Sequence, residues 1–179
     1  MQKTVYIIIL MACCLLEGSI VKAEVTLLPT HDGNTLNINW DLKIDTLKKN
    51  GAVLKSAKYN IYEYDNLLLF HFTPAGKLKR VSIRYPESGD FYKKTAEEML
   101  KYYQRRNIAY QIEHYKKLGM QSSLLTWINV PGDVFIALEY MVIITGGTRV
   151  DNVLIHAYHS NYYTKKDILQ EYRKSDFDF

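Results

Sequence analysis

The sequence predicts an α+β fold. We expect a two-layer sandwich, in which an antiparallel β-sheet of about six or seven strands is covered on one face by a long helix, with a short C-terminal helix. Three observations lead to this prediction. Residues 35–44 (TLNINWDLKI) alternate between apolar and polar side chains, residues 90–118 are rich in helix formers, and residues 134–159 form two apolar runs around a glycine pair. Since no linker or repeat interrupts residues 24–179, they should form a single α+β domain.

The strict alternation in residues 35–44 predicts a half-buried strand, with one face on a core and the other in water. A meander should follow it. Residues 58–64 and 67–72 are rich in β-favouring side chains and flank Asp65-Asn66, a plausible hairpin turn. A second turn then leads into residues 78–85, which complete the meander.

Residues 90–118 predict a long helix that ends at Gly119. Its apolar side chains form two stripes that are rotated by about a quarter turn relative to each other at ideal helical spacing. The helix therefore either bends or breaks near Asn107. Residues 108–115 (IAYQIEHY) also alternate passably as a strand, which is the alternative to a continuous helix.

The last third of the chain predicts a strand over residues 124–130, then a long hairpin and a helix. Residues 134–145 (VFIALEYMVIIT) have the composition of a central strand, and Gly146-Gly147 are typical of a two-residue turn into residues 148–159. Residues 163–172 predict the short terminal helix, with Thr164 as its N-cap.

This turn fixes the register of the hairpin, with Glu139 opposite Leu154 and Ala137 opposite His156. The even-numbered residues of 134–145 form the more apolar set, so their face should lie on the core beneath the long helix. The opposite face is mixed in character, and the register brings Glu139, His156 and Tyr158 within diagonal reach of one another.

Glu139, His156 and Tyr158 form the candidate surface cluster of this sequence. A carboxylate, an imidazole and a phenol on one face have the chemistry of an acid–base site. A cross-strand salt bridge beside a ring on an exposed sheet surface explains them equally directly and is the interpretation we favour. No residue is therefore assigned as catalytic.

The segment IHAYH contains His156 and His159, a pair that resembles a metal motif. Residues three apart on a strand point to opposite faces of the sheet, so these two imidazoles should not share a metal ion. We predict no metal site and no cofactor.

The N-terminus has the layout of a secretory signal peptide over residues 1–23. Lys3 precedes an uncharged apolar run, and the pattern before Glu24 suits cleavage after Ala23. The alternative is a bacterial lipoprotein signal, in which Cys13 becomes the lipidated first residue. Cleavage after Ala23 would remove both cysteines of the chain, which excludes disulfides, thiol catalysis and thiolate zinc sites from the mature protein.

The composition excludes some classes of function but does not identify the function itself. The formal net charge of +4 is mild, and the basic residues of 90–118 are interleaved with acidic ones, so we expect no nucleic-acid partner. The apolar run of the signal is too short to cross a bilayer, so the protein should not be transmembrane. The chain contains 15 tyrosines. Tyrosine is common at binding surfaces, but the interpretation we favour is that these rings fill strands and helix flanks.

Common catalytic motifs such as G-x-S-x-G and H-E-x-x-H are missing from residues 24–179. We therefore expect a secreted or periplasmic, non-enzymatic protein-binding or accessory module of the bacterial cell envelope, with a protein partner. An immunity protein or a secretion-system accessory protein would be examples. The alternatives are a small-ligand or lipid carrier with a cavity between helix and sheet, and a hydrolase that uses Glu139 and His156.

Overall fold

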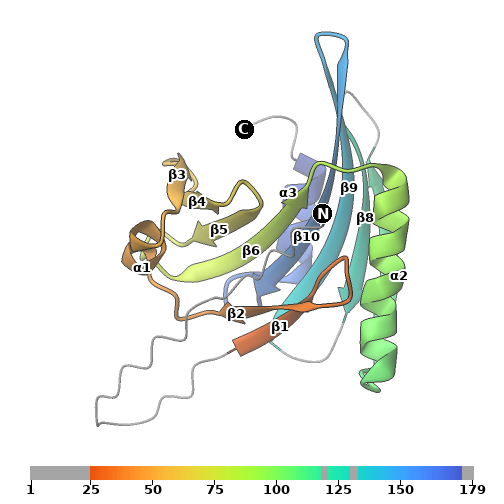
Figure 1. Ribbon diagram of the computed structural model, residues 1–179, viewed down its shortest axis with the longest axis horizontal. Helices are drawn as coiled ribbons and strands as arrows, with labels where there is room; N and C mark the ends of the chain where they lie inside the picture. Colours follow the sequence, from red (N-terminus) through yellow and green to blue (C-terminus); the bar gives the residue numbers. More distant parts are fainter. Residues whose placement is uncertain (1–24, 118–120, 130–132, 175–179) are drawn as a thin grey trace, which may run out of the picture.

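The computed structural model describes residues 25–117, 121–129 and 133–174 (Figure 1). The strands are β1 (Val25–Pro29), β2 (Thr35–Asn39), β3 (Val53–Ser56), β4 (Ile61–Tyr64), β5 (Leu68–Phe72), β6 (Leu78–Tyr85), β7 (Gln111–Lys117), β8 (Gln121–Asn129), β9 (Val134–Thr145) and β10 (Thr148–His159). The helices are α1 (Ile44–Lys49), α2 (Gly89–Arg105) and α3 (Lys165–Lys174). Within these ranges, no helix combines the length and the apolar composition that crossing a bilayer requires.

The main sheet has eight strands in the order β3-β4-β5-β6-β10-β9-β8-β7, and every neighbouring pair is antiparallel. It consists of two four-stranded meanders, β3 to β6 and β7 to β10, each built from strands that are consecutive in the chain. The last strands of the two meanders, β6 and β10, pair with each other and join them. We call this pairing the seam of the sheet.

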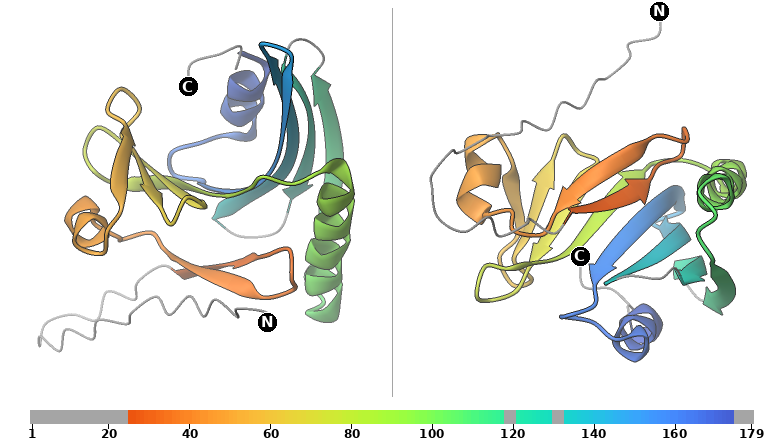
Figure 2. Two further views of the ribbon diagram at one scale, coloured as in Figure 1. Left: turned by 45° about the horizontal axis from the view of Figure 1, so that its top comes forward. Right: turned by 90° about the horizontal axis from the view of Figure 1, so that it is seen from below.

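Layers lie on both faces of this curved sheet (Figure 2). Helix α2 and the small β1–β2 sheet cover one face, and α3 covers the other. The main core lies on the α2 face, and a second apolar cluster lies beneath α3. The α+β sandwich predicted from the sequence is confirmed, with eight strands in the main sheet where about six or seven were expected.

The predicted hairpin register is confirmed along the whole of β9 and β10. Glu139 pairs with Leu154 and Ala137 with His156, as expected for a two-residue turn. Gly146 and Gly147 both have positive φ, 57° and 81°, which is the backbone conformation of a type I′ turn. The face predicted to be the core does pack beneath α2, where Ile136, Leu138 and other residues of β9 and β10 are buried.

The prediction of one helix over residues 90–118 is wrong in its second half. Helix α2 ends at Arg105, and β7 begins at Gln111, so the break near Asn107 and the alternative strand are what the structure shows. Gly119 lies outside the described residues. The physical reason is a Schellman-type end: Asn107 has φ 52°, its N–H bonds to Gln104 O at 3.1 Å, and the Ile108 N–H bonds to Tyr103 O at 3.0 Å.

The strand predicted over residues 35–44 is shorter than expected. Strand β2 ends at Asn39, whose side-chain oxygen accepts a hydrogen bond from the Asp41 N–H at 2.9 Å. Such a turn competes with the strand ladder, and the chain then enters α1. The strand also belongs to the small β1–β2 sheet and not to the main one.

At the C-terminal end, the cap predicted for the short helix is confirmed. Thr164 and Asp167 form a reciprocal capping box, in which the Asp167 N–H donates to Thr164 Oγ1 at 3.2 Å and the Thr164 N–H donates to the Asp167 carboxylate at 3.0 Å. Helix α3 therefore begins at a fixed point directly after β10. The strand predicted over residues 124–130 is β8, although Val130 lies outside the described residues.

The left-handed backbone at Asn107 leads to a first prediction. Asn107→Gly should leave the free energy of unfolding unchanged or slightly raise it, whereas Asn107→Val should lower it by about 1–2 kcal/mol, because a β-branched side chain is strained at positive φ. Urea denaturation of the two variants measures this. Equal stability of the glycine and valine variants would show that Asn107 does not terminate α2 in this conformation.

Candidate functional site

A row of polar side chains crosses three strands of the main sheet on its α3 face. Ser82 on β6 lies opposite His156 on β10, and Glu139 reaches the same imidazole from β9. Ser82 Oγ lies 2.8 Å from His156 Nδ1, and His156 Nε2 lies 3.3 Å from the Glu139 carboxylate. The predicted proximity of Glu139 and His156 is confirmed, and the structure adds Ser82 to the pair.

The hydrogen bonds of this row fix where its protons lie. A carboxylate only accepts hydrogen bonds, so His156 Nε2 carries a proton and donates a hydrogen bond to Glu139. Nδ1 of the neutral ring is then an acceptor, and the Ser82 hydroxyl donates to it. Hydroxyl, imidazole and carboxylate thus follow one another in the order used by a serine nucleophile and its general base.

The polar row is buried, whereas an active site must be open to its substrate. Only 1% of the Ser82 surface is exposed, and His156 and Tyr158 are buried as well. The expected location on an exposed sheet surface is therefore wrong. Helix α3 covers this face because its apolar side chains Ile168 and Tyr172 pack, together with Tyr163 just before the helix, into one cluster with Tyr158 and neighbouring sheet residues.

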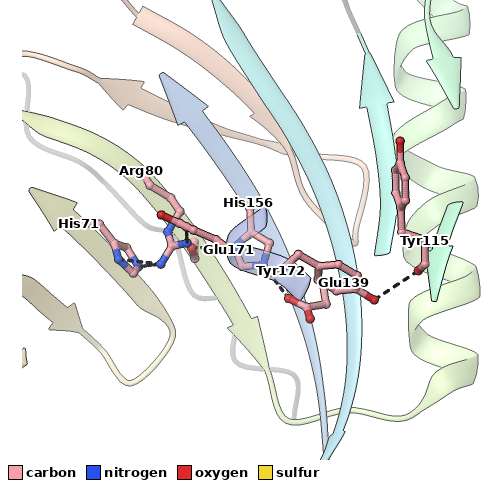
Figure 3. Close-up of polar contacts among 8 residues, drawn as sticks. His71, Arg80, Tyr115, Glu139, His156, Glu171 and Tyr172 are labelled. Carbon is pink, nitrogen blue, oxygen red and sulfur yellow. Dashed lines mark hydrogen bonds and ion pairs between the residues drawn. The ribbon is translucent and has the colours of Figure 1, made fainter. Parts of the chain in front are cut away.

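A second polar group lies at the other end of the same face (Figure 3). Arg80 on β6 donates from Nη2 to Nδ1 of His71 on β5 at 2.8 Å. Its Nη1 lies 3.6 Å from the Glu171 carboxylate on α3, and its guanidinium lies 5.5 Å from the ring centroid of Tyr158. Tyr158 connects the two groups, since its ring also lies 5.7 Å from that of His156.

Burial controls the electrostatics of both groups. Desolvation lowers the pKa of His156 below its usual 6.5, although its bond to Glu139 acts in the opposite direction. Desolvation, followed by the charge of Arg80, holds the pKa of His71 well below 6.5. Both imidazoles are therefore neutral at pH 7, and the contact of His156 with Glu139 is a hydrogen bond between a neutral ring and a carboxylate. Burial likewise raises the pKa of Tyr158.

The sequence-based reasoning missed Ser82, Arg80 and His71 as members of the site. Alternation along β6 places Ser82 on the face opposite Val81 and Ile83, but only the pairing of β6 with β10 shows that this face is also the face of His156. No local pattern indicates that seam, because it joins residues 74 positions apart in the chain.

The two histidines of IHAYH lie on opposite faces, as predicted. His156 bonds within the polar row, whereas the ring of His159 lies 5.0 Å from that of Trp40, on the α2 face. Across the described ranges, His, Cys, Asp and Glu form no group of three that could hold a metal ion. Comparison of the chain with family models, curated proteins and solved structures finds no match.

Neutral buried histidines make stability depend on pH. In the unfolded chain both imidazoles take up protons near pH 6.5, whereas in the folded protein they stay neutral to lower pH. The contribution of the two neutral histidines to the free energy of unfolding is therefore present above pH 6.5 and is lost as the pH falls. From pH 7 to pH 5 the free energy of unfolding should drop, with a slope of at most about 1.4 kcal/mol per pH unit for each histidine.

Denaturant melts at pH 7, 6 and 5 measure this slope. His71→Gln keeps an acceptor for Arg80 but cannot be protonated, so it should reduce the slope. His114→Gln, which makes the same replacement at an exposed position on β7, is the matched control. A slope that is the same in His71→Gln as in the unmodified protein would contradict this assignment.

Proposed function

We propose that this chain is a non-enzymatic protein-binding module, secreted or periplasmic, that acts as an accessory protein of the bacterial cell envelope. An immunity or secretion-system accessory role would suit such a module. The observation that supports this proposal best is the outer end of the β9–β10 hairpin, which projects beyond the rest of the sheet (Figure 1). We call residues 142–151 the arm.

The arm carries apolar side chains that its own core does not use. Ile144 is 54% exposed and Val150 is 46% exposed. They lie on opposite faces of the hairpin, because Ile144 pairs with Arg149 and Val150 with Ile143. Protein–protein contacts bury apolar side chains at their centre, so each face of the arm offers one apolar side chain to a partner.

Backbone groups of the arm are also open to a partner. Strand β10 pairs with β6 only over Val153–Tyr158, so the exposed stretch from Thr148 to Val150 extends past that neighbour. A strand edge without a neighbour can accept an extended segment of another protein through main-chain hydrogen bonds. The arm thus combines exposed apolar side chains with a strand edge that no other described strand pairs.

Side-chain hydrogen bonds connect the β10 strand of the arm to Tyr140 on the adjoining part of β9. Arg149 donates to Asp151 at 2.7 Å and to the Tyr140 hydroxyl at 3.0 Å. The Tyr140 hydroxyl in turn donates to Asp151 at 3.2 Å. A hairpin that is already ordered loses less conformational entropy on binding, which favours affinity.

The buried polar row supports a non-enzymatic function. A hydrolase would need Ser82 and His156 to contact a substrate, and both lie under α3. Within the described residues, this row therefore acts by satisfying the hydrogen bonds of a buried histidine. The carrier hypothesis stays a prediction from the sequence.

Charged substitutions in the arm test the proposal. Ile144→Lys and Val150→Lys should each weaken binding of a protein partner by about tenfold or more, because a lysine cannot replace an apolar anchor in a desolvated contact. Both positions are exposed, so the free energy of unfolding should change by no more than about 0.5 kcal/mol. Affinity purification from the envelope fraction identifies the partner, and titration of that partner gives the dissociation constants.

Leu27→Lys is the matched control, since Leu27 is a similarly exposed apolar residue, 48%, far from the arm on β1. This variant should bind the partner as the unmodified protein does. If both arm variants still bind the partner, the contact lies elsewhere on the surface of the protein. Recovery of no stoichiometric partner at all would argue against the protein-binding function itself.

The order of Ser82, His156 and Glu139 keeps a hydrolase as the second candidate function. Under that hypothesis, Ser82→Ala would abolish hydrolysis of chromogenic esters while the fold is kept. Under the proposed function, the same variant should show the same background rate as the unmodified protein. It should instead lower stability by about 1–3 kcal/mol, because His156 Nδ1 loses its donor in a buried site.

A further inference from the structure

Arg80 carries a positive charge that its neighbours among the described residues neutralise only in part. Its side chain is 19% exposed, so most of it has left water. His71, which accepts from Nη2, is a neutral ring and supplies no negative charge. A guanidinium is charged at any pH at which proteins fold, and a buried charge is costly unless an anion accompanies it.

The anion beside Arg80 is weakly placed. Glu171 approaches Nη1 at 3.6 Å, which is longer than a charge-assisted hydrogen bond, and its side chain is 54% exposed (Figure 3). Arg80 Nε is buried and has no hydrogen-bond acceptor among the described residues. The guanidinium therefore has donor capacity that Glu171 and His71 do not use.

A second cation shares the same carboxylate. Lys79 precedes Arg80 on β6, its ammonium lies 5.4 Å from the ring centroid of Tyr163, and it interacts electrostatically with Glu171. Two positive charges thus face one half-exposed carboxylate at the rim of α3. The side chains that surround them, those of Tyr158, Tyr163 and His71, are uncharged.

We propose that Arg80 and Lys79 form a binding site for a small organic carboxylate, which enters beside α3 and takes the place now held by the carboxylate of Glu171. Glu171 itself shows which chemical group the site accepts. A carboxylate can receive two N–H bonds from one guanidinium, so a free one can use donors that Glu171 cannot reach from its helix. This site does not depend on the arm or on a protein partner.

The test is a titration of the purified protein with sodium acetate against sodium chloride at constant ionic strength. The Nε–H signal of Arg80 in a nitrogen–proton correlation spectrum reports on the site directly. We expect this signal to shift with acetate and not with chloride. Glu171→Gln should bind acetate about two- to fivefold more tightly, because the competing carboxylate is gone; the gain is small because Glu171 is half exposed and its contact with Arg80 is long and weak.

Lys79→Gln should weaken acetate binding, and Arg80→Gln should abolish it. Lys101→Gln is the control, since Lys101 forms an exposed ion pair with Glu98 on α2, on the other side of the sheet, and should change nothing. Should Arg80→Gln fail to fold, Glu171→Gln and Lys79→Gln still decide the matter. An acetate response that is absent, or that is unchanged in Glu171→Gln, would overturn the proposal.

Discussion

The register of the β9–β10 hairpin determines which side chains of this protein meet. The glycine pair at its turn places Ile136 and Leu138 on the face beneath α2 and Glu139 and His156 on the face beneath α3. A slip of one residue would exchange these two sets and place the carboxylate of Glu139 in the apolar main core. Register is therefore strongly specified by the opposite character of the two faces.

The two faces of the sheet differ in the kind of side chains that they bury. The α2 face is an apolar core, in which side chains such as Met99 and Ile155 are completely buried. The α3 face mixes aromatic rings with a polar row that is satisfied mainly within itself. Helix α3 thus covers groups that would otherwise be hydrated, and its stability depends on the apolar cluster around Tyr163 and Ile168 outweighing that desolvation.

Local sequence patterns were sufficient for much of the fold. The alternation in β9, the glycine pair and the capping box of α3 each depend on residues within a few positions of one another, and the corresponding predictions are confirmed. The end of α2 was harder, since residues 108–115 suit either a helix or a strand, and a single asparagine at positive φ decides between them. The candidate site was predicted in part: Glu139 and His156 are joined by one hairpin, whereas Ser82 and Arg80 reach them only through the seam.

Pairing along the seam is also the step of folding that joins parts of the chain distant in sequence. Each meander pairs strands that are neighbours in the sequence, so each can form early and on its own. The pairing of β6 with β10 must close a long loop that contains α2 and three strands, which is the entropically demanding step. Because Ser82, Arg80, His156 and Tyr158 all lie along this pairing, the site exists only once both halves of the sheet have come together. A spectroscopic probe at His156 would therefore report the completed molecule, while probes within either meander would report its parts.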